Sequence, residues 1–228
     1  MSLILNIDTS TESATLCLAR EGVSISTSQN SNQKDHAAWI HPAIEHLLRD
    51  VSCSVSELKA IAVTAGPGSY TGLRVAMATA KGLCFALDIP LITVNTLRVM
   101  ALATKQSIQD KAIPQHTLFS PMIDARRMEV FTALFNWDLD EVIQSSAIVL
   151  HTELFAEQLL HNQVIFSGSG SQKFRQLSLH PNANFSNVTF SATQLAVLAN
   201  EKFTNGEFAD VAYSEPLYLK EFYTAAKK

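Results

Sequence analysis

Three adjacent residues near the start of the chain, Asp8, Thr9 and Ser10, have side chains that could meet a phosphate group or its magnesium ion. They end a short, mainly apolar run over residues 3–8, which predicts a buried strand. A carboxylate and two hydroxyls at a strand end lie beside exposed backbone N–H groups, a combination that binds anions and their cations. The same residue types also end strands by bonding to their own backbone. The sequence leaves both interpretations open.

A glycine-rich loop at residues 66–72, with the sequence Gly-Pro-Gly-Ser-Tyr-Thr-Gly, is the second candidate. It follows a predicted strand and opens a predicted helix over residues 73–87, whose N-terminus would attract an anion. The candidate phosphate-binding positions are Gly66, Gly68 and Ser69. The loop lacks the Lys-Ser/Thr pair of a P-loop and the glycine spacing of a dinucleotide fingerprint. Equally well, its glycines allow the next helix to approach the sheet closely.

The spacing of the histidines predicts no metal site. His36, His41 and His46 recur at five-residue steps on a predicted helix. Successive imidazoles there turn by about 140° and cannot share one face, whereas metal-binding pairs on helices are three or four residues apart. No Ser-His-Asp, Cys-His or paired-carboxylate set follows from spacing either. Arg126 and Arg127 in the predicted turn at residues 124–127 are expected to be solvated turn charges rather than an anion clamp.

The elements that would position these residues follow the order β-β-β-α-β-α-β-α in the first half of the chain, which describes a ribonuclease-H-like half-domain. Apolar patterns predict strands at residues 3–8, 14–19, 23–27, 60–64 and 91–94, and helices at 34–51, 73–87 and 96–106.

The second half repeats an α/β mixture. The predicted strands are 118–123, 128–135, 142–150 and 164–166, and the predicted helices are 152–160, capped by Thr152, and 192–203, opened by a capping box at Ser191. We therefore expect two tandem lobes, residues 1–110 and 111–228, which meet in the polar segment 107–114.

The composition limits the function classes. The chain has 228 residues, 47% of them hydrophobic, and a formal net charge of −4, which disfavours a protein that holds nucleic acid by itself. Three cysteines without CxxC spacing indicate reduced thiols. The first residues do not resemble a signal peptide, and charges interrupt the apolar stretch over residues 75–94. A cytoplasmic protein without a membrane span is expected.

Two predicted helices carry apolar residues over a wider arc than one sheet face covers. Ordinary core packing and a helix–helix interface with a partner explain this pattern equally well. An exposed patch there would also drive homodimerisation of the free chain. The candidate interface residues are Trp39, Ile40, Ala43 and Leu47 on the first helix and Leu73, Ala76, Met77 and Ala80 on the second.

Four segments, residues 4–11, 65–74, 123–126 and 215–220, together resemble the TsaB (YeaZ) family, and the resemblance extends over the whole chain. It implies the acetate-kinase, actin and chaperone-ATPase superfold. It also implies a non-catalytic scaffold that the paralogous transferase TsaD requires for threonylcarbamoyl transfer to tRNA. The acceptor is the adenosine beside the anticodon of tRNAs that read codons beginning with A. The implied partners are TsaD in a heterodimer, the ATPase TsaE in a larger complex, and tRNA only through that complex, with no cofactor and no membrane.

One residue pair distinguishes this chain from TsaD in that resemblance. TsaD carries a His-x-x-x-His metal pair after the strand that corresponds to residues 91–94, where this chain has Thr96 and Met100. A hydroxyl and a thioether do not replace two imidazoles for iron or zinc, so no metal is expected. The alternative is an enzyme in its own right, a nucleotide-dependent phosphotransferase or carbamoyltransferase. It would use Asp8 and the glycine loop, with Asp124 as a second carboxylate.

Overall fold

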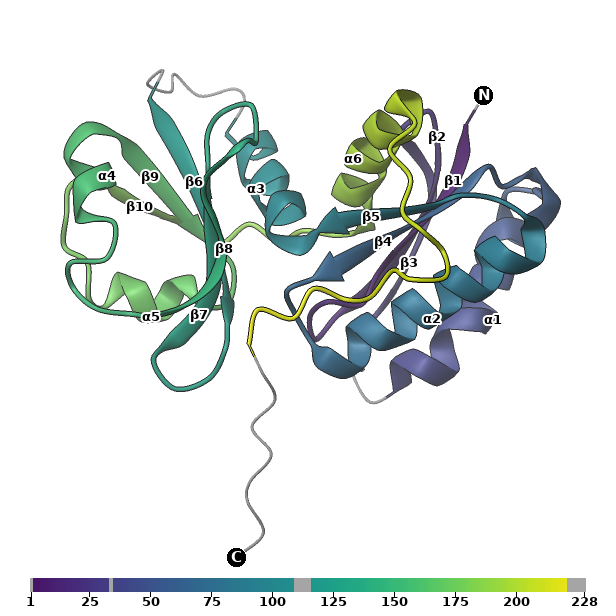
Figure 1. Ribbon diagram of the computed structural model, residues 1–228, viewed down its shortest axis with the longest axis horizontal. Coiled ribbons are helices and arrows are strands. Elements are labelled where there is room, and N and C mark those ends of the chain that lie inside the picture. The colour runs from purple at the N-terminus through teal and green to yellow at the C-terminus, as the bar shows by residue number, and fades with distance from the viewer. Residues whose placement is uncertain (1, 33–34, 109–115, 221–228) are drawn as a thin grey trace, which may run out of the picture.

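The chain folds into two lobes, each built on a five-stranded mixed sheet (Figure 1). The computed structural model describes residues 2–32, 35–108 and 116–220. The predicted boundary segment 107–114 lies mostly outside these residues. The α/β fold class and the two-lobed architecture expected from the sequence are confirmed.

The first sheet has the strand order β3-β2-β1-β4-β5. Its strands are β1 Leu3–Asp8, β2 Ala14–Arg20, β3 Val23–Asn30, β4 Ala60–Gly66 and β5 Leu91–Asn95. β1 pairs antiparallel with β2 and parallel with β4, and this places the carboxyl ends of β1 and β4 side by side. Each of these strands agrees with a predicted one to within a few residues.

Two helices of the first half cover one face of this sheet, and a third adjoins its other face at β4 and β5. They are α1 His36–Asp50, α2 Tyr70–Leu87 and α3 Thr96–Gln106, and a short 3-10 helix lies at Val55–Glu57. Leu3, Leu5 and Ile7 point to the face covered by α1 and α2, whereas Ile4 packs with α3 on the other. This is the alternation expected of a strand that is buried on both sides.

The second sheet repeats the arrangement of the first, with the order β8-β7-β6-β9-β10. Its strands are β6 Thr117–Asp124, β7 Glu129–Phe135, β8 Glu141–Val149, β9 Gln163–Ser167 and β10 Ala183–Ser186. Its helices are α4 Ala156–His161 and α5 Ser171–Arg175, and the chain then forms α6 Ala192–Asn205. β6 occupies the central place that β1 has in the first sheet, antiparallel to the next strand and parallel to β9.

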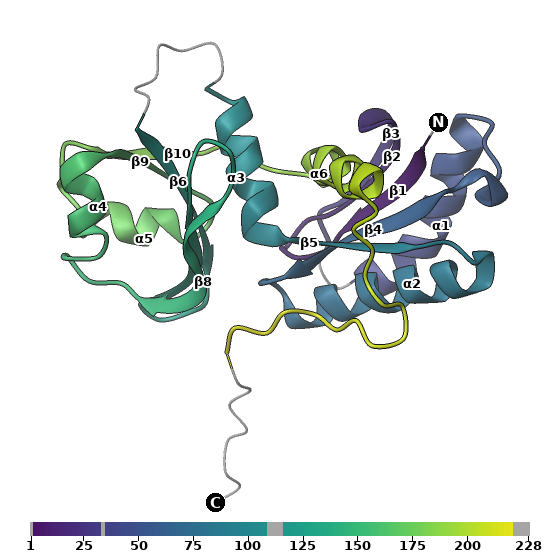
Figure 2. The ribbon, with the colours of Figure 1, turned by 45° about the horizontal axis from the view of Figure 1, so that its top comes forward.

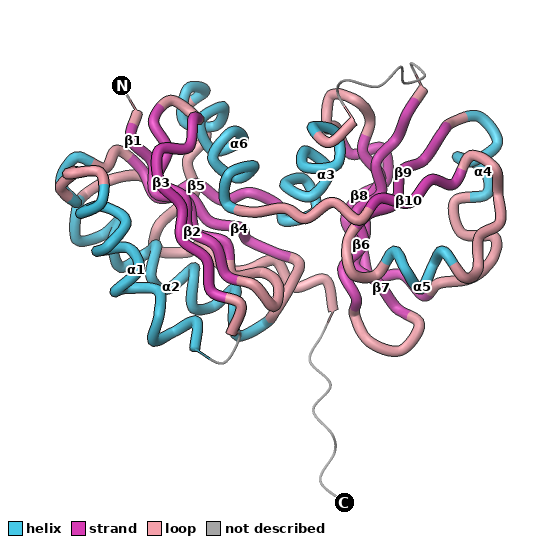
Figure 3. The backbone as a smooth tube through the Cα atoms, turned by 180° about the vertical axis from the view of Figure 1, so that it is seen from behind, coloured by secondary structure: helices cyan, strands magenta, loops and turns pink. Residues whose placement is uncertain are grey.

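A shared hydrophobic core joins the lobes. α3 lies between the two sheets (Figures 2 and 3) and contributes Leu97 and Met100 to a cluster that includes Ile4 from β1 and Phe119 from β6. Among the described helices, none is long and apolar enough to cross a membrane.

The end of the chain returns to the first lobe. α6 packs against β1, β2 and β3, and the N–H of Ala192 donates to Thr15 Oγ1 at 2.8 Å. Residues 209–220, which we call the C-terminal strap, then run along the first lobe, where Ala209 bridges to Leu91. α6 and the strap therefore contact the first lobe, although both follow residue 110, the predicted division of the chain. Local sequence patterns cannot reveal such a return, because the contacts join residues almost 180 positions apart.

In the second half, one predicted helix starts later in the structure, two short elements were not predicted, and one predicted cap is present. The helix predicted from Thr152 begins only at Ala156, after Phe155 adopts a left-handed φ of 61°. The short elements α5 and β10 were not predicted, since four or five residues carry too little periodicity. The capping box at Ser191 is confirmed, with reciprocal hydrogen bonds between Ser191 and Gln194.

Candidate functional site

The Asp8-Thr9-Ser10 segment meets the glycine-rich loop at the carboxyl ends of β1 and β4. The N–H of Ser69 donates to the carbonyl oxygen of Ser10 at 2.6 Å. Thr9 Oγ1 donates to the carbonyl oxygen of Gly72 at 2.6 Å. The structure thus brings together the two segments that the sequence singled out.

Asp8 is directed into this junction and is only 1% exposed. Its Oδ1 accepts from Ser10 N at 3.0 Å, from Ser10 Oγ at 2.6 Å and from Thr64 Oγ1 at 2.7 Å. Burial raises the pKa of the Asp8 carboxyl, because the loss of hydration outweighs these hydrogen bonds, which favour the charged form. The arrangement is that of a strand-ending turn, in which the carboxylate ties its own backbone to the neighbouring strand.

The glycines of the loop make this close contact possible. A Cβ at Gly68 would lie within 3.0 Å of the carbonyl oxygen of Ser10, and one at Gly72 would lie closer still to that of Thr9. Contacts this short between a Cβ and a backbone atom do not occur without a shift of the chain. The close-approach interpretation therefore accounts for both glycines.

Two donors that a phosphate would need are already used by the chain. Ser69 N bonds to Ser10, and Gly72 N donates to Ser69 Oγ at 3.3 Å, which caps α2. Phosphate binding at Asp8, Thr9, Ser10, Gly66, Gly68 and Ser69 stays a prediction, and this geometry disfavours it.

The C-terminal strap covers the same loop from outside. Leu217 N donates to the carbonyl oxygen of Ala65 at 2.6 Å, and a Cβ at Gly66 would lie 2.7 Å from the carbonyl oxygen of Leu217. Further along, Arg74 Nε donates to Tyr218 Oη at 3.0 Å. The rings of Tyr218 and Tyr70 are in contact, tilted by 47° with centroids 5.3 Å apart.

Sequence reasoning identified residues 215–220 only as part of a family resemblance and missed this covering role. The paired aromatics Tyr70 and Tyr218 were the available signal, but nothing local joins residues 148 positions apart.

The predicted partner-interface residues lie mainly inside the first lobe. Only Trp39 is half-buried, and Leu73 is buried beside Gly66. The six others are buried in the core that α1 and α2 form with the sheet: Ile40, Ala43, Leu47, Ala76, Met77 and Ala80. The wide apolar arcs arise because α1 and α2 pack against each other as well as against the sheet. These seven side chains therefore cannot form an exposed contact surface.

The outward face of the two helices consists of other residues. A shallow hollow of about 260 Å³ lies between them, lined by His41, Ala78, Thr79, Gly82 and Leu83. Phe85 on α2 is 85% exposed, unusual for a large aromatic side chain.

Thr96 and Met100, which stand where TsaD has its metal-binding histidines in the resemblance, are both buried. Thr96 opens α3 beside Asn95, which caps the helix by accepting from Leu97 N at 2.8 Å. Met100 is buried and lies against Gly168 of the second lobe. Neither side chain has the chemistry of a good zinc or iron ligand. Among the residues that the structure describes, no three His, Cys, Asp or Glu side chains are grouped as a metal site would require.

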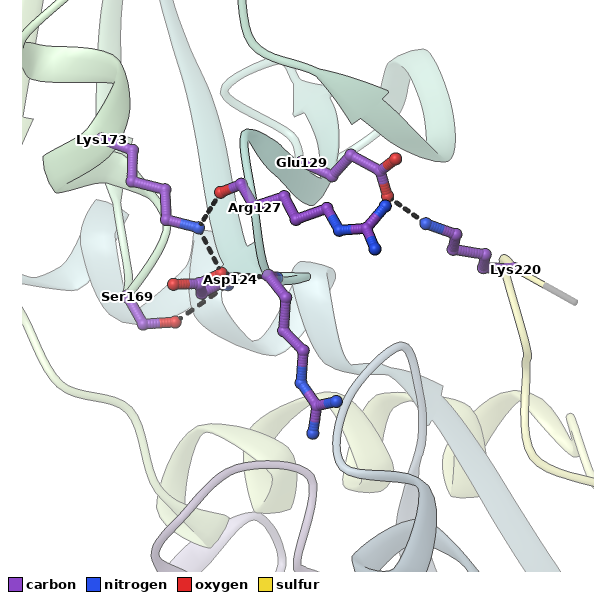
Figure 4. Close-up of polar contacts among 7 residues, drawn as sticks. Asp124, Arg127, Glu129, Ser169, Lys173 and Lys220 are labelled. Carbon is purple, nitrogen blue, oxygen red and sulfur yellow. Dashed lines mark hydrogen bonds and ion pairs between the residues drawn. The ribbon is translucent and has the colours of Figure 1, made fainter. Parts of the chain in front are cut away.

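Asp124, the second carboxylate of the enzyme alternative, is engaged in its own turn (Figure 4). Its Oδ1 accepts from Arg126 N at 2.7 Å and from Lys173 Nζ at 2.5 Å. These two contacts favour the turn role for Asp124, one of the two roles that the sequence left open.

Comparisons with known proteins agree with this architecture. The family model described as "TsaD: tRNA N6-adenosine threonylcarbamoyltransferase" matches residues 24–224. The tRNA threonylcarbamoyladenosine biosynthesis protein TsaB of Bacillus subtilis is 32% identical over 235 residues, which cover 95% of this chain and 93% of that protein. TsaB of Escherichia coli is 28% identical, with 95% and 94% covered. The solved structure of YeaZ from Pseudomonas aeruginosa has the same fold, with a TM-score of 0.77 at 23% identity over 96% of this chain and all of that one.

Proposed function

This chain belongs to the TsaB (YeaZ) family, and we propose that it is the non-catalytic partner subunit of a TsaD-type transferase. In this role it supports transfer of a threonylcarbamoyl group to the adenosine beside the anticodon of tRNAs that read codons beginning with A. The transferase would supply the catalytic groups, and this chain would supply a folded surface that the transferase requires. Such a complex would act in the cytoplasm, where tRNA is modified.

One observation carries the non-catalytic assignment: the junction where this superfold would hold a phosphate is closed by the chain's own atoms. Asp8 is buried and accepts three internal hydrogen bonds. The N–H of Ser69 is used by Ser10, and the C-terminal strap lies over Ala65 and Gly66. An enzyme that turns over a nucleotide needs donors aimed at a space that the phosphate can enter. This junction supports a structural role instead.

The alternative, an independent phosphotransferase or carbamoyltransferase, requires two carboxylates that are free to act. Asp8 is enclosed, and Asp124 is held by Lys173 and by the N–H of Arg126. The two assignments differ in a direct measurement, the turnover of ATP or of threonylcarbamoyl-adenylate by the purified chain alone. We expect no turnover, and no cofactor or metal in the active complex that belongs to this chain.

The outward face of α1 and α2 is the proposed contact surface for the transferase. Its central hollow is lined by no Asp, Glu, Lys or Arg and includes the small residues Ala78 and Gly82, which permit helices to approach to about 8 Å. Phe85 would be its aromatic anchor, since an exposed aromatic of this size loses most contact with water on docking. The same face would form an isologous homodimer in the absence of the partner. TsaE would join the larger complex, and tRNA would bind to the assembly.

Size-exclusion chromatography with the cognate TsaD homologue tests the surface. We expect Phe85→Glu to fold normally, because the side chain is 85% exposed, and to weaken assembly. Loss of an aromatic anchor of about 2 kcal/mol or more corresponds to roughly 30-fold weaker binding.

The matched control is Val197→Glu on α6, which places the same charge at a 41% exposed helical position outside the contact surface. It should assemble as the wild type does. Unchanged affinity for both variants would place the contact elsewhere. Charge at Ala76 or Ala80 would not test the surface, because both are buried in the core and the fold itself would suffer.

A further inference from the structure

The turn between β6 and β7 carries two arginine charges that the surrounding residues leave uncompensated. Asp124 at the start of this turn pairs with Lys173, and Glu129 at its end pairs with Lys220 of the C-terminal strap (Figure 4). Each carboxylate near the turn is therefore already neutralised by a lysine. Arg126 and Arg127 are exposed, and within residues 2–32, 35–108 and 116–220 neither guanidinium has an ion-pair partner. In a chain with a net charge of −4, this is a local surplus of two positive charges.

The backbone of the turn is held firmly in place. Asp124 Oδ1 accepts from Arg126 N at 2.7 Å, and Lys173 Nζ donates to the carbonyl oxygen of Arg127 at 2.6 Å. Asp124 N donates to Ser169 Oγ at 3.1 Å in the loop after β9. Contacts from three directions fix where both arginines leave the backbone, although their side chains are exposed.

The conformation of the turn makes the choice of arginine unusual. Arg126 has a φ of 70° and Arg127 a φ of 49°, both in the left-handed region. Glycine and asparagine adopt that region more easily, and other residues there are destabilised by about 1 kcal/mol each. Two consecutive arginines at such positions do not serve the turn itself. Their exposed guanidiniums are the property that distinguishes them from the residues a turn prefers.

The ligand that fits this arrangement is a chain of phosphates on the surface. A guanidinium binds a phosphate through two parallel N–H···O bonds, and an always-charged side chain keeps this ability at any physiological pH. Neither the hollow between β3 and α1 nor the one between α1 and α2 includes a residue of this turn. An extended phosphodiester backbone therefore suits the turn better than a nucleotide whose base needs an enclosing pocket.

We propose that Arg126 and Arg127 contact the phosphate backbone of the RNA substrate, a proposal that rests on the function proposed above. The sequence led us to expect that tRNA reaches this chain only through its partner. The turn would instead add one or two phosphate contacts from this chain to an assembly whose main RNA affinity comes from elsewhere. Contacts of this kind position the RNA without reading its sequence.

The test is a titration of fluorescently labelled tRNA with the complex of this chain and its TsaD homologue at several salt concentrations. The double variant Arg126→Gly/Arg127→Gly removes both charges and keeps the turn, because glycine accepts positive φ. We expect the slope of log affinity against log salt to fall by about 1 to 2, and affinity at about 0.1 M salt to weaken by roughly tenfold or more.

Two further variants separate charge from conformation. Arg126→Lys/Arg127→Lys keeps both charges and should restore the salt slope. Arg20→Ala is the control. It removes an exposed arginine in the first lobe, at the end of β1 away from Asp8, where Arg20 pairs with Leu3. It should leave tRNA binding unchanged.

Unchanged tRNA affinity and salt slope in the glycine double variant would overturn the proposal. Loss of assembly with the transferase by that variant would also overturn it, since the turn would then be a protein contact. The proposal would also be overturned if the glycine double variant lost binding of ATP or ADP by the complex while it kept tRNA binding. Failure of the wild-type chain to assemble in size-exclusion chromatography counts against the proposed function alone. The same titration on the unassembled chain then decides the role of the arginines.

Discussion

The two lobes place an aspartate at the same point of the same topology, yet the two residues have opposite surroundings. Asp8 ends β1 and Asp124 ends β6, each the central strand of its sheet. In both lobes a glycine-containing loop after the neighbouring parallel strand lies against that strand end: Ser69 contacts Ser10, and Ser169 contacts Asp124. The first junction is closed and buried, whereas the second is exposed and rich in charge.

The comparison indicates how one repeated framework supports two uses. Burial raises the pKa of Asp8, and the side chain there holds the end of β1 to Ser10 and to Thr64 of β4. At Asp124 burial also acts to raise the pKa, but the hydrogen bonds from Lys173 and from Arg126 N, with the charge on Lys173, outweigh it and lower the pKa. The equivalent aspartate thus organises a surface turn that remains available to a ligand.

The largest expected effect concerns the closed junction. Gly72→Ala would force a Cβ against the carbonyl oxygen of Thr9, a backbone atom that cannot move without β1. We expect the free energy of unfolding to fall by about 3 kcal/mol, measured by urea denaturation. Gly170→Ala in the second junction should lower it less, because its nearest neighbour is the side-chain Cγ1 of Val130 at 2.6 Å.

The control for these glycines is Gly82→Ala on α2, where no atom lies within 4 Å of an added Cβ. It should raise the free energy of unfolding by about 0.5–1 kcal/mol, because alanine favours the helix. If the changes at Gly72 and Gly170 lowered the free energy of unfolding equally, the contrast between the buried first junction and the exposed second junction would be contradicted.

The second prediction uses the raised pKa of Asp8. A carboxyl whose pKa is raised in the folded state contributes stability that is fully present below its ordinary value of 3.8 and is lost as pH rises through the folded pKa. Asp8→Asn does not titrate, so its free energy of unfolding relative to the wild type should increase as pH rises above 3.8. Thermal melts from pH 4 to pH 7 would measure this gap, and a gap that stays constant would show that Asp8 is not buried as described.

The transfer activity of a complex that contains Asp8→Asn tests whether Asp8 has a structural or a catalytic role. If Asp8 is structural, Asp8→Asn should leave threonylcarbamoyl transfer by the assembled complex within about tenfold of the wild type, or about 1.4 kcal/mol. A loss of several thousandfold in a complex that still assembles would favour the enzyme alternative.

The smallest expected effect is at the exposed junction, and its pH dependence has the opposite sign. The lowered pKa of Asp124 means that its pairing with Lys173 stabilises the fold above pH 3.8 and is lost as pH falls through the folded pKa. Because the pair is partly exposed, Asp124→Asn should lower the free energy of unfolding by only about 0.5 kcal/mol at pH 7. The deficit should shrink in acid. A deficit that grows in acid would contradict the opposite shifts of the two aspartates.

The sequence by itself determined the elements of the first lobe, the start of α6 and the family. Strand alternation and helical periodicity predicted all five strands of the first sheet and α1, α2 and α3 to within a few residues. The capping box at Ser191 marked the start of α6. These features are visible because each depends on residues a few positions apart, whose backbone preferences and apolar spacing act locally. The motifs at residues 65–74 and 215–220 likewise indicated the family before any contact was known.

Only the tertiary structure decided which polar and apolar groups remain accessible. Ala76 and Ala80 have the same local sequence whether they face a partner or a core, and α1 together with the sheet makes them core. Ser10 and Leu217 enclose the glycine loop from opposite ends of the chain. The arginines of the β6–β7 turn stay uncompensated because Lys173 and Lys220 arrive from distant segments to pair with the two acids. Each outcome depends on contacts between residues tens to hundreds of positions apart, and a local pattern does not record what will pack against it.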